Sequence, residues 1–329
     1  MVDKRIVIWG TGRRAAMYSA WLKENFHIVA YVATCDVPKT IHGIGVVAPE
    51  HVREVACDYI VLTVELDEVE REKERLCETD SELLERCVTI DEAVTWNTTS
   101  DYLAYTNERQ LRVIRDLLSA SDERIADYDW MYQKVVEYGI FCFNPNHWIE
   151  ASEKVNWAVY GLQQVPEEFA AFCTKLSTLT VGTAAEVGVY RGRSAFFICA
   201  VLARKNPDLR YKMIDIFDRI DDFALFAKVL PQLEKCIPSS SDDYKGQEFD
   251  FVFIDADHSY DASILDYNNI GQQAKVLTCF HDIYAHEYDH ENGGTVRTWL
   301  EVMERTEDKE HWTFSKYPEQ WMGIGCVVW

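Results

Sequence analysis

Short apolar runs that end in polar residues recur along the chain and predict the strands of two sheets. Apolar runs of this length are typical of strands that are buried on both faces of a parallel sheet. They lie at residues 4–9, 27–32 and 59–64 in the first third of the chain, and at 183–187, 210–214, 249–254 and 275–280 in the second half. Helix-like segments separate most of them, which indicates an α/β fold. Two further runs near the C-terminus suit a last pair of antiparallel strands.

Between these two sets of strands the pattern becomes helical. Residues 108–118 and 123–138 carry apolar side chains at helical spacing. A chain of 329 residues is long for one domain. We therefore predict two Rossmann-like parallel-sheet domains, residues 1–98 and 163–329, joined by a helical connector over 99–162 that also covers the second domain's active site.

The charge and the cysteines narrow the range of functions. A net charge of −22 disfavours binding to nucleic acid and to anionic membranes, because contacts with phosphates need a basic surface. The ten cysteines include no C-x-x-C pair, and neither a signal peptide nor an apolar run of about 18 residues is present. These features predict a cytoplasmic protein without disulfides. We also expect a homo-oligomer, most simply a symmetric dimer.

The first predicted strand runs directly into Gly10-Thr11-Gly12, and a helix-like segment follows. This layout is typical of a dinucleotide-binding unit, in which Arg13 and Arg14 would help to hold a phosphate. No acid ends the second strand, and Asp36 comes a few residues late. Residues 1–98 resemble the small nucleotide-binding domains attached to bacterial sugar-modifying enzymes. A module that packs against a partner remains the alternative.

A second glycine turn follows the strand at 183–187, where the chain reads Glu186-Val-Gly188-Val-Tyr-Arg-Gly192-Arg-Ser194. This acid-x-Gly-x-x-x-Gly spacing resembles the first motif of class I S-adenosylmethionine-dependent methyltransferases. The resemblance implies that Gly188 lets the backbone approach the cofactor and that Gly192 opens the turn into the helix. Glu186 would orient the cofactor's amino group, and Ser194 would cap the helix or contact the cofactor. Asp215, after the next strand, would bind the ribose hydroxyls.

The stretch FDFVFIDADHSY at 249–260 ends a strand in two carboxylates and an imidazole, Asp255, Asp257 and His258. Ligands of open α/β sheets bind at this end of the strands. The plain alternative is an Asx turn followed by a helix cap at Ser259 or Asp261. The stretch is close to an I-D-x-D-H-x-Y signature, and residues 163–329 resemble metal-assisted small-molecule methyltransferases, which include macrolide and sugar O-methyltransferases and cephalosporin-hydroxylase-like proteins.

This second resemblance implies a magnesium-like ion held by Asp255, His281 and Asp282, with Asp255 also near the cofactor. His258, with Asp257 beside it, would be catalytic and would remove the proton of the acceptor. The sequence departs from the family at His281-Asp282, because the pair there is normally acid-acid or acid-amide. A hard cation gains little from imidazole. Either His281 turns away or helps to bind the substrate, or the ion is absent or softer than magnesium.

These patterns predict an S-adenosylmethionine-dependent O-methyltransferase that acts on a sugar-like or polyhydroxylated small molecule, with or without a divalent cation. Two other functions stay open. The first is a nucleotide-sugar-modifying enzyme that works through the N-terminal domain. The second is a non-catalytic module that binds a cofactor or a partner.

Overall fold

The computed structural model describes residues 4–12, 15, 18, 22–23, 25–33, 39–64, 68–79, 81–90, 92–93, 100–141, 160–318 and 321–329. Contacts between Cα atoms group the described residues into two compact units, and the division falls between Tyr105 and Thr106. Each unit is described by itself. Arg13 and Arg14, which we expected to hold a phosphate, lie outside the described residues.

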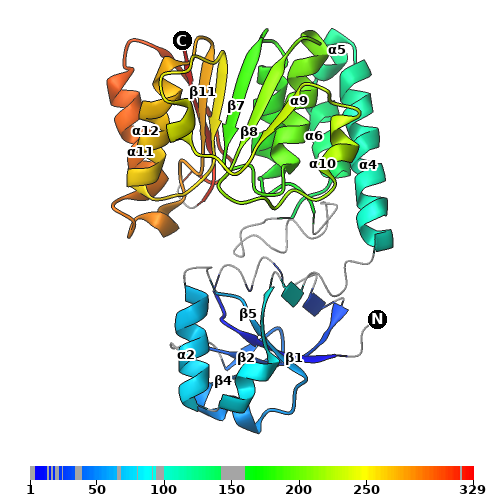
Figure 1. Cartoon of the computed structure of the whole chain (residues 1–329), viewed down its shortest axis with the longest axis vertical. Coiled ribbons are helices and arrows are strands. Elements are labelled where there is room, and N and C mark those ends of the chain that lie inside the picture. The colour runs from blue at the N-terminus through cyan, green and yellow to red at the C-terminus, as the bar shows by residue number, and fades with distance from the viewer. Residues whose placement is uncertain are drawn as a thin grey trace. The chain divides into compact units, whose positions relative to one another are not determined.

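The first unit is built on a six-stranded sheet in the order β3-β4-β2-β1-β5-β6. Its strands are β1 (Arg5–Trp9), β2 (His27–Val32), β3 (Thr40–Ile41), β4 (Ile44–Val47), β5 (Tyr59–Leu62) and β6 (Cys87–Thr89). All neighbouring strands are parallel except β3 and β4. Helix α2 (Val69–Thr79) and the 3-10 helices η1 (Pro49–Glu54) and η3 (Ser81–Arg86) complete its regular elements among the described residues (Figure 1).

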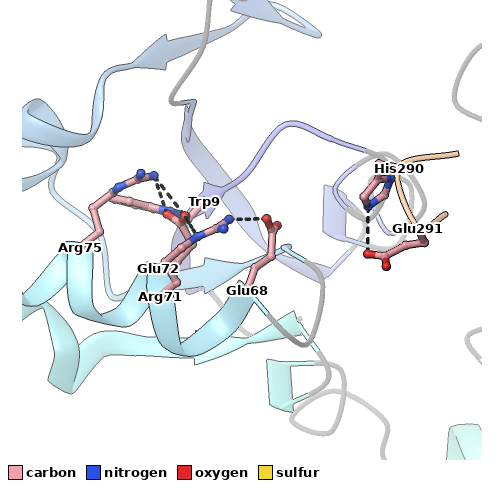
Figure 2. Close-up of polar contacts among 7 residues, drawn as sticks. All are labelled: Trp9, Glu68, Arg71, Glu72, Arg75, His290 and Glu291. Carbon is pink, nitrogen blue, oxygen red and sulfur yellow. Dashed lines mark hydrogen bonds and ion pairs between the residues drawn. The ribbon is translucent and has the colours of Figure 1, made fainter. Parts of the chain in front are cut away.

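A buried polar contact fixes α2 to the first strand. The indole nitrogen of Trp9 donates a hydrogen bond of 2.9 Å to Oε2 of Glu72. Arg75 donates to both carboxylate oxygens at 3.1 Å, and Arg71 lies beside the same carboxylate (Figure 2). A buried carboxylate is costly unless it is paired. These partners therefore allow Glu72 to be buried against the end of β1.

The second unit is built on a seven-stranded sheet in the order β12-β13-β11-β10-β7-β8-β9. Its strands are β7 (Thr183–Val187), β8 (Arg210–Ile214), β9 (Leu233–Cys236), β10 (Phe251–Ile254), β11 (Leu277–His281), β12 (Glu310–Phe314) and β13 (Ile324–Val328). Strand β13 is antiparallel to both β11 and β12, and the other pairs are parallel. The predicted α/β class, with two largely parallel sheets and an antiparallel last strand, is confirmed. Strand β9 was not predicted.

Helices cover both faces of this sheet (Figure 1). On one face lie α4 (Ser100–Ser119), α6 (Tyr128–Tyr138), α8 (Pro166–Leu176) and α9 (Arg193–Lys205), and on the other α11 (Tyr260–Asn269) and α12 (Gly294–Arg305). The shorter elements are α5 (Asp122–Ile125), α10 (Phe223–Ala227) and the 3-10 helices η5 (Ser241–Tyr244), η6 (Gly271–Gln273) and η7 (His286–Tyr288). Along β7, Ala184 faces the first group of helices and Ala185 and Val187 face the second, as the two-residue period of a strand requires.

The helices of the predicted connector are part of the core of the second unit. Apolar side chains of α4 and α6, such as Ile114, Leu117 and Val135, are fully buried in the same cluster as Phe197 of α9. Burying such side chains stabilises each by about 1.5–3 kcal/mol relative to exposure. The division into residues 1–98, 99–162 and 163–329 stays a prediction, while the contacts place residues 106–141 with the second sheet.

Within the described parts of the chain, no helix is long and apolar enough to span a membrane.

Candidate active site

The loop from β7 to α9 packs directly on the end of β10, and this contact requires glycine at position 188. Gly188 has a φ of +85°, and a Cβ atom there would lie 2.1 Å from the carbonyl oxygen of Asp255. Its N–H donates to the carbonyl of Ile214 at 2.9 Å, which ties the loop to β8 as well. The loop therefore joins three strand ends. The close approach seen in the structure is to the backbone of Asp255, a contact we did not predict from the sequence.

Glu186 is buried and its carboxyl group is held by the protein. Oε1 accepts a hydrogen bond of 2.6 Å from Ser194, and Oε2 accepts one of 2.5 Å from the hydroxyl of Tyr211. Burial raises the pKa of Glu186 to about 7, although both hydrogen bonds favour the ionised form. The N-cap of α9 is Gly192 rather than Ser194. The predicted contacts of Glu186 and Ser194 with a cofactor stay predictions.

Asp215 follows the last residue of β8 and is half-buried. Its carboxylate accepts hydrogen bonds of 2.9 Å from the N–H of Tyr190 and from the N–H of Phe217. The side chains of Ile216 and Phe217 are 60% and 55% exposed. The end of β8 thus offers a carboxylate beside an apolar surface.

Two carboxylates and two imidazoles meet where β10 and β11 end. Nε2 of His258 lies 2.9 Å from Oδ2 of Asp282 and 3.8 Å from Oδ1 of Asp255. Nδ1 of His281 lies 3.2 Å from Oδ1 of Asp255 and 3.4 Å from Oδ1 of Asp282. The side chains of His281 and Asp282 are each 3% exposed, whereas that of His258 is 26% exposed. We refer to these four residues as the His/Asp cluster.

The charges in the His/Asp cluster stabilise one another. Burial alone would lower the pKa of His258, but the charges and hydrogen bonds of Asp282 and Asp255 outweigh burial and raise it to about 9. The same balance raises the pKa of His281 well above its usual value. Burial would raise the pKa of both aspartates, yet the neighbouring imidazoles lower it, most strongly for Asp282. The cluster therefore holds two negative and two positive charges at neutral pH.

The structure brings together most, but not all, of the predicted catalytic and metal-binding residues. Asp257 is exposed, and its carboxylate accepts a hydrogen bond from the N–H of Ser259, two residues on. Ser259 is the N-cap of α11. These contacts match the plain alternative of an Asx turn and a helix cap, so Asp257 lies apart from the His/Asp cluster. Its catalytic role stays a prediction.

The histidine-rich segment after the cluster makes its contacts locally. His286 lies 3.2 Å from Asp289, and His290 lies 3.3 Å from Glu291 (Figure 2). The ring of Tyr288 in this segment packs against the ring of His258 at an angle of 34°, with ring centroids 4.4 Å apart. Sequence reasoning missed Tyr288, because a tyrosine in a polar loop carries no signal of its contact.

The His/Asp cluster meets the requirements of a small metal site. Asp255, His258 and Asp282 each offer a ligand atom, and these atoms lie within 4.8 Å of one another. Oδ1 of Asp282 is buried and has no hydrogen-bond partner within the described part of the chain. Carboxylate oxygens are the ligands that Mg²⁺ and Mn²⁺ prefer. The residues present therefore fit a divalent cation.

The order of the seven strands, with one reversed strand beside the edge, agrees with the methyltransferase-like fold that we predicted for the second half of the chain. Residues 185–283 match the family described as a methyltransferase domain, which confirms the prediction of a methyltransferase in the second half of the chain. Residues 2–80 match a second family, described as C2185-like, N-terminal.

Solved methyltransferase structures are similar to the chain at low identity. An O-methyltransferase from Bacillus cereus, crystallised with S-adenosylhomocysteine, is 12% identical; the match covers 60% of this chain and 90% of that one, with a TM-score of 0.39. The O-methyltransferase TomG from Streptomyces achromogenes, crystallised with S-adenosylmethionine, is 14% identical. The match covers 60% of this chain and 88% of that one, with a TM-score of 0.37. TM-scores this low add nothing to the family match. No curated protein matches the chain.

Proposed function

We propose that the second unit transfers the methyl group of S-adenosylmethionine to a hydroxyl of a sugar-like or polyhydroxylated small molecule. The observation that carries this proposal is the His258–Asp282 pair, which lies on the same edge of the sheet as the Gly188 loop and Asp215. A cofactor bound at the ends of β7 and β8 would present its methyl group toward β10 and β11, where His258 lies. An imidazole beside a buried carboxylate can take a proton from an acceptor.

In the proposed reaction the neutral form of His258 keeps its Nε2–H on Asp282 and takes the proton of the acceptor hydroxyl at Nδ1 as the oxygen attacks. Because the pKa of His258 is raised to about 9, this form becomes more abundant, and transfer faster, as the pH rises toward that value. The cofactor supplies the methyl group, whose carbon forms a bond to the acceptor oxygen as its bond to sulfur breaks. Asp282 keeps the imidazole in place and stabilises the imidazolium that results. Tyr288 limits the movement of the ring from its other side. Holding the two reactants in line accounts for much of the rate enhancement in such reactions.

A divalent cation is the second part of the proposal, and we assign Asp255 and Asp282 to hold it. Bound there, a divalent cation lowers the pKa of a neighbouring hydroxyl. His258 remains the base, because it is 26% exposed while His281 is 3% exposed, and an acceptor can reach only the more exposed imidazole. His281 is then a buried partner of both carboxylates and does not turn away from them, as one of the alternatives supposed.

Replacing Asp215 by alanine is expected to weaken S-adenosylmethionine binding about 10- to 100-fold, because a charged acceptor of hydrogen bonds from the ribose is lost. Asp218→Ala is the control, since Asp218 is exposed and pairs with Lys235. Calorimetric titration of the full chain with S-adenosylmethionine and S-adenosylhomocysteine measures both. Equal affinity of Asp215→Ala and the wild type for S-adenosylmethionine would contradict the role of Asp215 in binding the ribose. If the wild type binds neither cofactor form, the first unit is tested next with nucleotide-sugars.

Binding of a divalent cation is expected to release up to two protons and to weaken as the pH falls. Both imidazoles of the His/Asp cluster are protonated at neutral pH, since the pKa of His258 is raised to about 9 and that of His281 well above its usual value. A cation bound by the two carboxylates competes with the protons on these imidazoles and displaces them. Calorimetry with Mg²⁺ in two buffers of different ionisation enthalpy gives the number of protons. Identical heats in the two buffers would show that the cation does not bind at the cluster.

The acceptor is tested directly with labelled methyl transfer from S-adenosylmethionine. Nucleoside diphosphate sugars and free polyols form the first panel, and small phenols form the comparison. Transfer to a phenol alone would contradict the sugar-like acceptor while leaving the O-methyltransferase assignment in place.

A further inference from the structure

A buried amide that sequence reasoning did not single out adjoins the His/Asp cluster. Gln164 lies two residues before α8, and its side chain is 2% exposed. Its amide nitrogen is 3.4 Å from Oδ2 of Asp255, at the long limit for a hydrogen bond. Its carbonyl oxygen has no hydrogen-bond partner in the part of the chain that the structure describes. A buried amide oxygen without a partner costs about 1–3 kcal/mol, so its position needs a reason.

The backbone that carries Gln164 is firmly held. Leu162 exchanges hydrogen bonds of 2.8 and 2.7 Å with the carbonyl of Gly139 and the N–H of Phe141. The side chain of Gln110 donates to the carbonyl of Tyr160 at 2.8 Å. On the other side, α8 begins at Pro166. The amide is thus placed against Asp255 by rigid elements.

A cation beside Asp255 would give the orphaned oxygen a partner. The oxygen and nitrogen of an amide exchange places by a rotation of 180°, and the surrounding charges decide which of them faces a neighbour. With the carboxylate alone, the N–H faces Asp255. With a cation between them, the carbonyl oxygen faces the ion. Asp282 contributes a second buried oxygen without a hydrogen-bond partner in the described residues.

We propose that Gln164 supplies a neutral oxygen ligand to a divalent cation held by Asp255 and Asp282. This inference rests on the proposed cation site and adds a ligand to it. The amide oxygen takes the place of the acid or amide that the sequence lacks at His281. Three oxygen ligands with water at the remaining positions suit Mg²⁺ or Mn²⁺.

The test is the affinity of the full chain for Mn²⁺, followed by the electron paramagnetic resonance signal of the free ion. Gln164→Leu removes the oxygen and keeps most of the volume, and we expect it to bind Mn²⁺ about 10- to 100-fold more weakly. Gln164→Glu restores an oxygen and is expected to bind at least as tightly as the wild type. Gln163→Ala is the matched control, because Gln163 is the neighbouring glutamine, is only half-buried and makes no contact with the cluster that the structure shows. Melting temperature and S-adenosylmethionine affinity are measured for each variant.

Unchanged Mn²⁺ affinity in Gln164→Leu, or equally weak binding by Gln164→Leu and Gln164→Glu, would overturn the proposal. Failure of the wild type to bind Mn²⁺ would also overturn it. The methyltransferase assignment is tested separately, by titrating the wild type and Asp215→Ala with S-adenosylmethionine. Failure of the cation site can therefore be distinguished from failure of the methyltransferase assignment. If Gln164→Leu does not fold, the Mn²⁺ affinity of Gln164→Glu is compared with that of the wild type. Loss of Mn²⁺ binding in Gln164→Glu would contradict an oxygen ligand at this position.

Discussion

His258→Ala is expected to lower the rate of methyl transfer about 10²- to 10⁴-fold, the usual contribution of a positioned general base. The imidazole is the most exposed member of the His/Asp cluster, and Asp282 at 2.9 Å fixes the direction of its Nε2. Alanine leaves no group in this place that could accept a proton. The affinity for S-adenosylmethionine should stay within about threefold, because the described contacts of His258 are to Asp255, Asp282 and Tyr288.

The control for this variant is His286→Ala, which removes an exposed histidine of the histidine-rich segment after the cluster. The partner of His286 is Asp289. We expect it to keep the wild-type rate. Steady-state kinetics with labelled cofactor, together with the melting temperature of each variant, separate chemistry from stability. Full activity in His258→Ala would exclude the proposed base.

Gly188→Ala is expected to destabilise the protein by about 4 kcal/mol or more, in the range of exceptional single substitutions. Two effects add. A φ of +85° is unfavourable for alanine, and the new Cβ would lie 2.1 Å from the carbonyl oxygen of Asp255 and 2.4 Å from the Cα of Ala256. Backbone atoms at the end of a central strand cannot move aside without disturbing the sheet.

Gly246→Ala isolates the first effect, the strain of the backbone. Gly246 has a similar φ of +79°, but no heavy atom lies within 4 Å of the position that a Cβ would take there. Its substitution should therefore cost only the backbone strain, about 1–2 kcal/mol. Urea unfolding of the two variants measures the difference. If Gly188→Ala were as stable as Gly246→Ala, the packing of the loop on β10 would be wrong.

Sequence patterns predicted the strands that carry the site better than the contacts within it. The strands β7, β8, β10 and β11 end within one or two residues of the predicted positions, because buried parallel strands leave short and distinct apolar runs. Strand β9, Leu233–Cys236, has only one buried residue and gave no such run. We predicted α4 and α6 only as a connector that also covers the second domain's active site. Their packing in the core of the second unit was not predicted, since an amphipathic helix shows that one face is buried but not what buries it.

Within the site, the sequence identified the acids and histidines but not their pairing. Asp257 and His258 are neighbours in the chain, yet the turn after β10 directs His258 to Asp282 and leaves Asp257 exposed. Such a difference depends on the geometry of a single turn. Gln164 had no signal at all, because its distance from Asp255 results from the packing of segments 91 positions apart in the chain.

The reversed strand β13 has a consequence for the synthesis of the enzyme. It pairs with β11 up to His281, and the N–H groups of Ile283 and Tyr284 bond to the carbonyls of Gly323 and Met322. The residues that support the His/Asp cluster are therefore translated after the cluster itself, and a nascent chain folds from its N-terminal parts onward. Until residues 321–328 have left the ribosome, β11 remains an open edge. The turn that carries Asp282 is therefore held from the β10 side alone until these residues pair with β11.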